Sequence, residues 1–170
     1  QNIFKEDLQR LFALIQYFKP EQLLFVGDLF HSHQNKELEL FLKWRNDMPG
    51  LQMQLIRGNH DILPKKFYKD ARIDISEQAL SVENFCFTHD INSHCKAANT
   101  KNVFTFSGHV HPGIRFSGMG KQALYFPCFY FTKKYAILPA FSRFTGLAKI
   151  KPKESDKVFV IVENSVVKVG

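Results

Sequence analysis

Four segments of the chain end in residue types that bind metal ions in proteins. Each is a short apolar run followed by polar residues: GD at 27–28, GNHD at 58–61, THD at 88–90 and GHVH at 108–111. Carboxylate oxygens, amide oxygens and imidazole nitrogens are common ligands of divalent cations. Because ligands gather beyond the carboxyl ends of strands in open α/β sheets, we expect these four segments to converge on one site.

The last of these segments places His109 and His111 two residues apart, inside the stretch SGHVHPG. On an extended strand, residues at i and i+2 project from the same face, so both imidazoles are expected to point to one ion or to two neighbouring ions. Two histidines in a strand are by themselves more often a solvated edge than a metal site. The other three segments are what favour the metal site here.

The residue types suit a two-metal hydrolase. A carboxylate can bridge two cations, and an amide oxygen with neutral imidazoles can complete the shells without enough negative charge to repel a phosphate. Two ions about 3.5–4 Å apart generate a hydroxide that attacks phosphorus in line, and they clamp the attacking and leaving oxygens. The expected site residues are Asp28, Asn59, His89, His109 and His111.

The elements that must position these residues are read from hydrophobic periodicity. An amphipathic helix ends at Pro20, and its apolar positions are Leu8, Leu11, Phe12, Ile15 and Phe18. A buried strand QLLFV, a helix over 35–47 and a second strand within 51–56 follow, and this order predicts a parallel pair with a right-handed crossover. The second helix carries Leu38, Phe41, Leu42 and Arg45 along one side.

After Pro64 the pattern changes to short alternating strands, and residues 163–165 predict a hairpin turn near the end of the chain. Many of the 18 phenylalanines alternate with polar residues, which suits the interior of stacked sheets. The expected fold is a single α/β domain over residues 1–170, with two packed mixed β-sheets flanked by helices. Gly27, Gly58 and Gly108 are expected to permit tight turns before the site residues.

Composition narrows the class of protein. The net charge of +7 favours an acidic partner such as nucleic acid, although a solvated basic surface explains a modest excess equally well. Three cysteines without CxxC spacing predict neither a disulfide framework nor a thiolate zinc site. With no membrane-length apolar run and no signal segment, we expect a cytoplasmic protein that does not bind a membrane.

The order GD, GNHD, a lone strand-end His and GHxH resembles the calcineurin-like metallophosphoesterase superfamily, over residues 25–112. The resemblance implies the sandwich of two mixed sheets flanked by helices. It also implies that Asp28 bridges two metal ions, that Asn59, His89 and His109 bind one ion, and that His111 binds the other.

The same resemblance implies roles in catalysis. His60 is the expected catalytic imidazole, which protonates the leaving oxygen or binds the transition-state phosphoryl group together with Asn59. Some relatives carry an aspartate three residues after the bridging one, and this chain has His31 there, so His31 is expected to contact the substrate phosphate. The implied cofactors are two divalent ions, Mn²⁺ first, with Fe, Zn, Ni or Mg as alternatives.

One family motif has no counterpart in this sequence. The superfamily opens with Asp-x-His at the end of its first strand, and no such motif precedes the first predicted helix. The ion held by His111 therefore lacks two expected ligands. We expect that the chain lacks its natural N-terminus together with the family's first strand. The alternative is a one-metal or inactive relative in which one metal site is empty.

A finer resemblance extends almost to Gly146. The segments GDLFHSHQNKELELF, LIRGNHDIL, SGHVHPG, FPCF and LPAFSRFTG are similar to bacterial DNA ligase-associated metallophosphoesterases, described as DNA damage response endonucleases. This implies phosphodiester hydrolysis in DNA, and DNA ligase or helicase pathway partners. The alternatives are a non-catalytic nucleic-acid-binding or assembly subunit, and a small-nucleotide phosphodiesterase. Exposed strand edges in the tail make a homodimer a further expectation.

Overall fold

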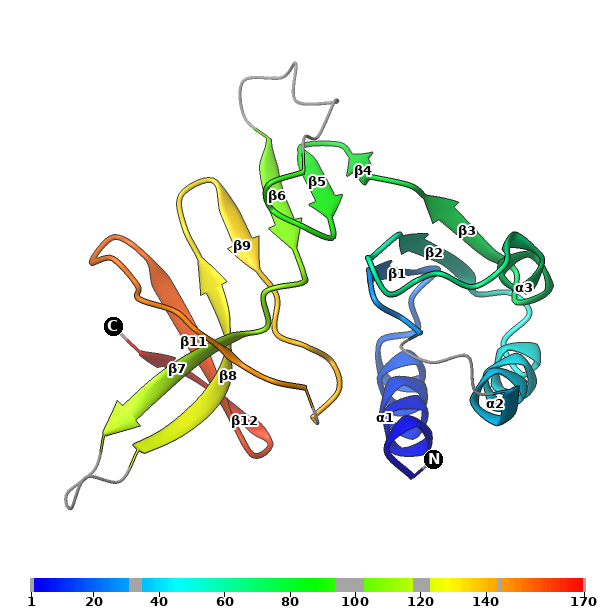
Figure 1. The fold of residues 1–170 in the computed structure, drawn as a ribbon, viewed down its shortest axis with the longest axis horizontal. Helices are drawn as coiled ribbons and strands as arrows, with labels where there is room; N and C mark the ends of the chain where they lie inside the picture. The colour runs from blue at the N-terminus through cyan, green and yellow to red at the C-terminus, as the bar shows by residue number, and fades with distance from the viewer. Residues whose placement is uncertain (1, 31–34, 94–102, 118–122, 144, 170) are drawn as a thin grey trace. The chain divides into compact units, whose positions relative to one another are not determined.

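The structure is a computed structural model, which describes residues 2–30, 35–93, 103–117, 123–143 and 145–169. The chain divides into two compact units, Gln1–Glu77 and Gln78–Gly170, here called the N-terminal and the C-terminal unit. Figure 1 traces the order of the elements along the chain. The mixed α/β class with several sheets and few helices, expected from the sequence, is confirmed.

The N-terminal unit contains a three-stranded parallel sheet in the order β1-β2-β3. Its elements are α1 (Asn2–Phe18), β1 (Gln22–Val26), α2 (Asn35–Asn46), β2 (Gln52–Ile56), α3 (Lys65–Asp70) and β3 (Ile73–Ser76). The parallel pairing of β1 with β2 confirms the prediction from the strand, helix, strand order. The short helix α3 was not predicted, because its six residues are too few for an apolar period to show.

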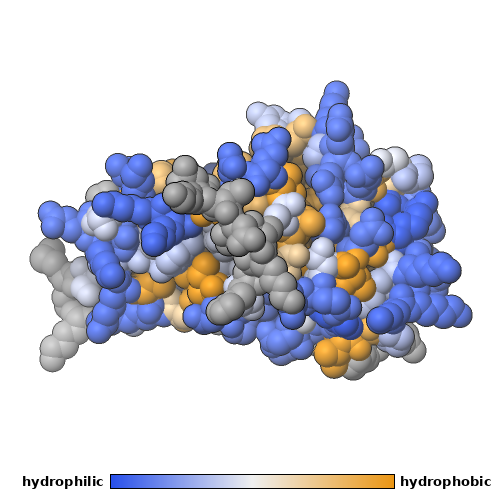
Figure 2. Space-filling view, turned by 90° about the horizontal axis from the view of Figure 1, so that it is seen from above, coloured by the Kyte–Doolittle hydropathy of each residue, from blue (hydrophilic) through white to orange (hydrophobic). Residues whose placement is uncertain are grey.

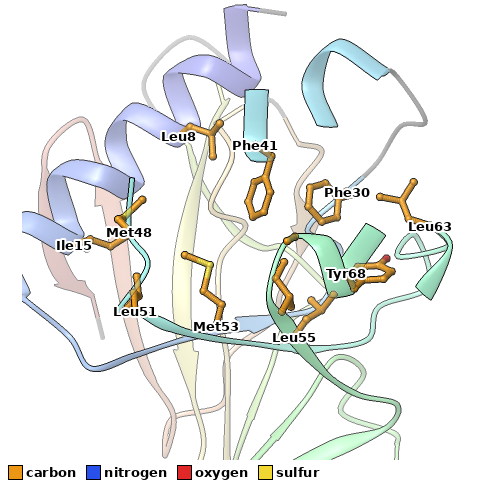
Figure 3. Packing of buried hydrophobic residues seen from close by; sticks show 12 residues of the cluster. Leu8, Ile15, Phe30, Phe41, Met48, Leu51, Met53, Leu55, Leu63 and Tyr68 are labelled. Carbon is orange, nitrogen blue, oxygen red and sulfur yellow. The ribbon is translucent and has the colours of Figure 1, made fainter. Parts of the chain in front are cut away.

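The core of this unit lies between the helices and the sheet (Figure 3). Phe41 of α2 and Leu55 of β2 are fully buried, and α1 contributes Leu8 and Ile15. Two residues expected on the apolar face of α1 differ, since Phe12 and Phe18 are 41% and 69% exposed. Leu11 packs against the core as predicted, and the stripe also contains Phe4, which was not predicted; Phe4, Leu8 and Leu11 follow the i, i+4, i+7 spacing of one helix face.

Arg45 is buried with the apolar side of α2, as its spacing predicted. Its guanidinium donates hydrogen bonds to the backbone carbonyls of Ala71 at 3.0 Å, Leu51 at 2.9 Å and Met48. A buried cation is tolerated only where its donors are satisfied, and burial lowers the pKa of this guanidinium. Arg45 therefore joins the end of α2 to the segments that lead into β2 and β3.

The C-terminal unit is built from strands. They are β4 (Ala79–Val82), β5 (Phe85–Thr88), β6 (Phe104–Ser107), β7 (Pro112–Ser117), β8 (Ala123–Phe131), β9 (Tyr135–Ile137), β10 (Ala148–Lys149), β11 (Lys157–Val162) and β12 (Ser165–Val169). The sheet order is β10-β7-β8-β9-β6-β5-β4, with β11 paired to β8 and β12. Pairing of β5 with β6 and of β6 with β9 is parallel, and the long β8 runs antiparallel to β7 and β9.

The predicted hairpin at residues 163–165 is confirmed by the antiparallel pair β11 and β12, in which Val162 faces Ser165. Cys128, Val158 and Val160 form the buried centre of this part of the unit. Cys128 carries a thiol whose pKa burial raises to about 11. Cys86 is disulfide-bonded, which the cysteine spacing did not predict.

Apolar side chains also reach the surface. On the face in Figure 2, apolar patches lie between hydrophilic side chains. Several large hydrophobic residues are more than 40% exposed, among them Tyr17, Ile62 and Leu124. Within the described ranges, no helix has both the length and the hydrophobicity to cross a membrane.

Candidate functional site

The loop after β1 carries the first expected metal ligand. Gly27 has φ 81° and Asp28 has φ 54°, so two consecutive residues are in the left-handed region. Glycine adopts this region without steric cost, whereas Asp tolerates it only with local hydrogen bonding. The expectation that Gly27 permits a tight turn is therefore confirmed, and the turn places Asp28 directly beyond the end of β1.

A second carboxylate, Asp61, holds this strained loop in place. It is fully buried and accepts four backbone N–H groups: those of Asp28 and Gly58 on Oδ2, at 2.7 and 2.9 Å, and those of Leu29 and Phe30 on Oδ1, at 2.9 and 3.2 Å. Burial raises the pKa of Asp61, and the backbone hydrogen bonds oppose this shift. One side chain thus joins the loop after β1 to the loop after β2.

Gly58 is required for a different reason from Gly27. A Cβ atom added at Gly58 would lie 2.2 Å from Oδ1 and 2.4 Å from the backbone nitrogen of Asp28. No side chain can occupy that space unless the loop moves. The expected role of Gly58 as a turn residue is thereby replaced by a steric one, since its missing side chain lets the two loops touch.

Asn59 and His60 follow Gly58, and both are exposed. The backbone N–H of His60 donates to Oδ1 of Asp28 at 2.9 Å. The residue before the loop is also fixed, because Arg57 donates through Nε to the carbonyl of Asp61 at 3.0 Å and forms an ion pair with Glu77. The N-terminal unit therefore brings Asp28, Asn59 and His60 together at the ends of β1 and β2.

The C-terminal unit brings together two of the predicted histidines. His89 follows β5 and is buried, whereas His109 follows β6 and is exposed. Nε2 of His89 lies 3.0 Å from Nδ1 of His109, and the ring centroids are 4.8 Å apart. Because β5 and β6 are parallel neighbours, both residues extend from the same edge of the sheet. This convergence was the central expectation for these two residues.

The prediction that His109 and His111 lie on an extended strand was wrong. β6 ends at Ser107 and β7 begins at Pro112, so neither histidine belongs to a strand. Both have positive φ, 64° for His109 and 50° for His111. The i, i+2 argument assumed an extended backbone, and the positive φ at both histidines shows that the backbone is not extended there. Gly108, expected to permit the turn, is not among the described residues with positive φ.

Backbone and hydroxyl contacts hold the His89 end of this pair. The N–H of Gly108 and the hydroxyl of Ser107 both donate to the carbonyl of His89, at 3.1 and 3.0 Å. The hydroxyl of Thr88 donates to the carbonyls of Gln78 and Asp90. Ser107 and Thr88 are fully buried, and the hydrogen bond from the Ser107 hydroxyl is buried with them.

The geometry of the two imidazoles fits a divalent cation. Nitrogens that are each about 2.1 Å from one ion lie about 3.0 Å apart when the angle between the two bonds is near 90°. The separation of 3.0 Å between the His89 and His109 nitrogens has this value. Imidazole nitrogens placed in this way are donors that first-row divalent ions accept.

The contacts described so far do not place the other three predicted site residues at a metal ion or a substrate. The backbone carbonyl of His111 accepts the N–H of Ala148 at 2.9 Å, and the half-buried His111 precedes β7 directly. No ligand role for His111 or for Asn59 follows from these contacts alone. His31, expected to contact substrate, lies outside the described residues.

Two supporting residues were missed or assigned another role. Asp61, which appeared in the sequence only as the last residue of the GNHD segment, holds backbone groups more than 30 positions earlier in the chain. Ser107 gave no signal, because a single serine at a strand end is common. For Asp61 the available signal was its place at the end of a glycine-led loop, because aspartate side chains in turns and loops commonly accept backbone N–H groups.

Comparisons with known proteins place this geometry in context. The sequence model of the family "Calcineurin-like phosphoesterase" matches residues 4–127. Among solved structures, nuclease MPE of Pseudomonas putida is similar, with a TM-score of 0.81 and 27% sequence identity, over 98% of this chain and 78% of that chain. No curated protein matches the sequence.

Proposed function

Because the chain belongs to the calcineurin-like phosphoesterase family and is a metal-dependent phosphoesterase, we propose that it hydrolyses phosphodiester bonds in nucleic acid, as a DNA-repair nuclease. The observation that carries this proposal is the similarity to a nuclease along nearly the whole chain, at 27% identity. The net charge of +7 supports a polyanionic substrate.

The proposed ligands are the residues identified from the sequence. Asp28 would be shared between two ions, Asn59, His89 and His109 would serve as ligands of one ion, and His111 would serve as a ligand of the other. The contacts within each unit support this assignment, because Asp28 is fixed beside Gly58 and the nitrogens of His89 and His109 converge. Family membership implies divalent ions, and we propose Mn²⁺ as the preferred one. Bound ions supply Lewis-acid activation of water and neutralise charge on the phosphoryl oxygens.

The chain's own residues perform the remaining steps. Asp61 fixes the backbone of the Asp28 loop, so the carboxylate of Asp28 is held in one orientation before substrate arrives. His60 is exposed beside it, with its backbone N–H bound to Asp28. We assign to the His60 imidazole the proton that the leaving oxygen requires, and to Asn59 a contact with the phosphoryl oxygens.

Hydrolysis by the full chain tests the proposal. After removal of metal with EDTA and addition of Mn²⁺, we expect cleavage of single-stranded or plasmid DNA and of bis(4-nitrophenyl) phosphate. His60→Ala is expected to lower kcat by about 10²–10⁴-fold, the range for loss of a general acid. Asp28→Asn is expected to lower activity at least as far, and to lower the number of bound ions measured by elemental analysis.

The matched control is Asp74→Asn, an exposed carboxylate in β3 that lies outside the site. It should retain activity and metal content. DNA binding without metal-dependent cleavage would instead favour the non-catalytic nucleic-acid-binding subunit. Cleavage of cyclic or small nucleotides without cleavage of DNA would favour the small-nucleotide phosphodiesterase. A cytoplasmic location, ligase or helicase partners and a homodimer stay predictions from the sequence.

A further inference from the structure

The charges of this chain are unevenly distributed. None of the 16 Asp and Glu residues lies between positions 91 and 153, whereas ten of the 23 Lys and Arg residues do. The rest of the chain carries 13 basic and 16 acidic residues and is slightly acidic. The net positive charge therefore arises from one continuous segment, which contains β6 to β10 of the C-terminal unit.

Three described residues of this segment lie on one face of its sheet. Arg115 of β7 pairs directly with Tyr125 of β8, and Lys149 of β10 pairs with Gly113 of β7. Paired residues of neighbouring strands point to the same side, so Arg115, Tyr125 and Lys149 share a face. Figure 1 shows β7 and β8 side by side.

The opposite face of these strands is the apolar one. Ile114, Phe126 and Ile150 are the sequence neighbours of the three residues, and they pack against the buried cluster around Cys128. Successive side chains alternate between faces, which places Arg115, Tyr125 and Lys149 outward. Arg115 and Lys149 are exposed, and Tyr125 is 48% exposed. This surface, called the outer face below, carries two cations and an exposed aromatic ring.

One end of the outer face lies next to His111, a candidate metal ligand. Pro112, the first residue of β7, follows His111, and the N–H of Ala148 in β10 donates to the carbonyl of His111 at 2.9 Å. Along a strand, Gly113 and its partner Lys149 are about 7 Å beyond His111, and Arg115 about 13 Å. At 3.4 Å per nucleotide of a stacked strand, these distances correspond to about two and four nucleotides.

We propose that the outer face binds a single-stranded segment of nucleic acid that flanks the scissile phosphodiester. Lys149 and Arg115 contact phosphates about two nucleotides apart, and the ring of Tyr125 stacks on one unpaired base. The chemistry is that of single-strand binding surfaces, in which cations follow the backbone and aromatic rings take base faces without reading sequence. The inference rests on the proposed function, because it assigns the path of that substrate away from the metal ligands.

Binding of fluorescein-labelled oligo-dT to the full chain, followed by fluorescence anisotropy in EDTA, tests the outer face without cleavage. Arg115→Ala with Lys149→Ala should weaken binding at least tenfold. The slope of log affinity against log salt should become less steep by about 1.4, because each lost phosphate contact on a single strand removes about 0.7. Tyr125→Ala should weaken binding about tenfold, and Tyr125→Phe should retain the affinity, since phenylalanine keeps the stacking face.

The control variant removes the same charge elsewhere in the same unit. Lys133 and Lys134 are exposed in the turn after β8, at the other end of that strand from Tyr125. Lys133→Ala with Lys134→Ala should change the affinity by less than twofold. Equal weakening by the two double variants would overturn the inference, because binding would then follow net charge alone. An unchanged affinity in Tyr125→Ala, or equal weakening on blunt duplex DNA, would overturn the stacking on an unpaired base.

Cleavage assays separate this inference from the proposed function. In the outer-face variants, kcat/KM on DNA should fall at least tenfold further than kcat/KM on bis(4-nitrophenyl) phosphate, which has no flanking strand. Oligo-dT binding that depends on the outer face, in a protein that cleaves neither substrate, would support the inference and contradict the proposed nuclease. If the outer-face variants cleaved DNA as fast as the parent protein, the proposed nuclease would be supported and the inference would be contradicted.

Discussion

The loops after β1 and β2 and the loop between β6 and β7 both present candidate ligands directly beyond strand ends, but they are held in different ways. In the first region, one buried carboxylate, Asp61, binds four backbone N–H groups from two loops. In the second region, backbone hydrogen bonds and the hydroxyl of Ser107 hold the backbone of His89 beside the end of β6.

Because the two regions are held differently, substitutions in them should have effects of different size. In the N-terminal region, four backbone hydrogen bonds depend on the side chain of Asp61. The contact between the two loops depends on the missing side chain of Gly58. The C-terminal region divides its hydrogen bonds between a backbone N–H and a hydroxyl, so one side-chain substitution removes only part of them. We therefore expect large effects from single changes at Asp61 and Gly58, and small ones at supporting residues of the C-terminal region.

Asp61→Ala should give the largest effect. The substitution leaves four N–H donors without their acceptor, and buried unsatisfied donors cost about 1–3 kcal/mol each before water and relaxation compensate. We expect the free energy of unfolding, from urea titration, to fall by about 4 kcal/mol. Asp61→Asn keeps one acceptor oxygen and should lose less. A loss below about 1 kcal/mol in Asp61→Ala would remove the distinction between the two regions.

Gly58→Ala should come next. The added methyl group would overlap the carboxylate and backbone of Asp28 and displace the loop, at about 2 kcal/mol in the free energy of unfolding. Metal-dependent diester hydrolysis should fall with it, since Asp28 moves. Gly50→Ala is the control, because a Cβ at Gly50 meets no atom within 4 Å. If both alanine variants retained activity, the steric role of Gly58 would be wrong.

Ser107→Ala tests the second region. It removes the hydroxyl hydrogen bond to the carbonyl of His89 but leaves the N–H of Gly108 in place. We expect a loss of about 1 kcal/mol in the free energy of unfolding, with most of the diester hydrolysis retained. Ser155→Ala, at an exposed residue, is the comparison variant. A loss as large as that of Asp61→Ala would show that this region also depends on one side chain.

Asp156 is a surface carboxylate that can be compared with the buried Asp61. Its substitution should give the smallest loss of stability. It accepts hydrogen bonds from the hydroxyl of Tyr130 at 2.6 Å and the N–H of Lys153 at 2.9 Å, and the Tyr130 hydroxyl is the main cause of its lowered pKa. A lowered pKa in the folded state stabilises the fold at neutral pH, and this stability is lost as the pH falls through that pKa. Thermal unfolding should show Asp156→Asn slightly less stable at pH 7, with the difference closing below pH 3.8. A constant difference from pH 7 to pH 2 would contradict this.

Much of the chemistry followed from residue types and local patterns. The apolar runs predicted β1 and β2, their order predicted a parallel pair, and the polar residues after them supplied the ligand types. Period and capping are properties of neighbouring residues, so α2 and the hairpin at 163–165 were also accessible to sequence reasoning.

Tertiary structure decided how those residues are held. Asp61 binds the N–H groups of residues 28–30 across 31 to 33 positions, and no local pattern specifies which backbone groups a carboxylate will meet at that separation. The need for glycine at position 58 likewise arises only when Asp28 comes within contact of it. The left-handed backbone at His109 and His111 depends on β6 and β7 leaving the loop in set directions, which the strands' partners impose. The sequence determined which chemical groups stand at the strand ends, and long-range contacts decided how they are oriented, because orientation depends on atoms that are neighbours only in the folded chain.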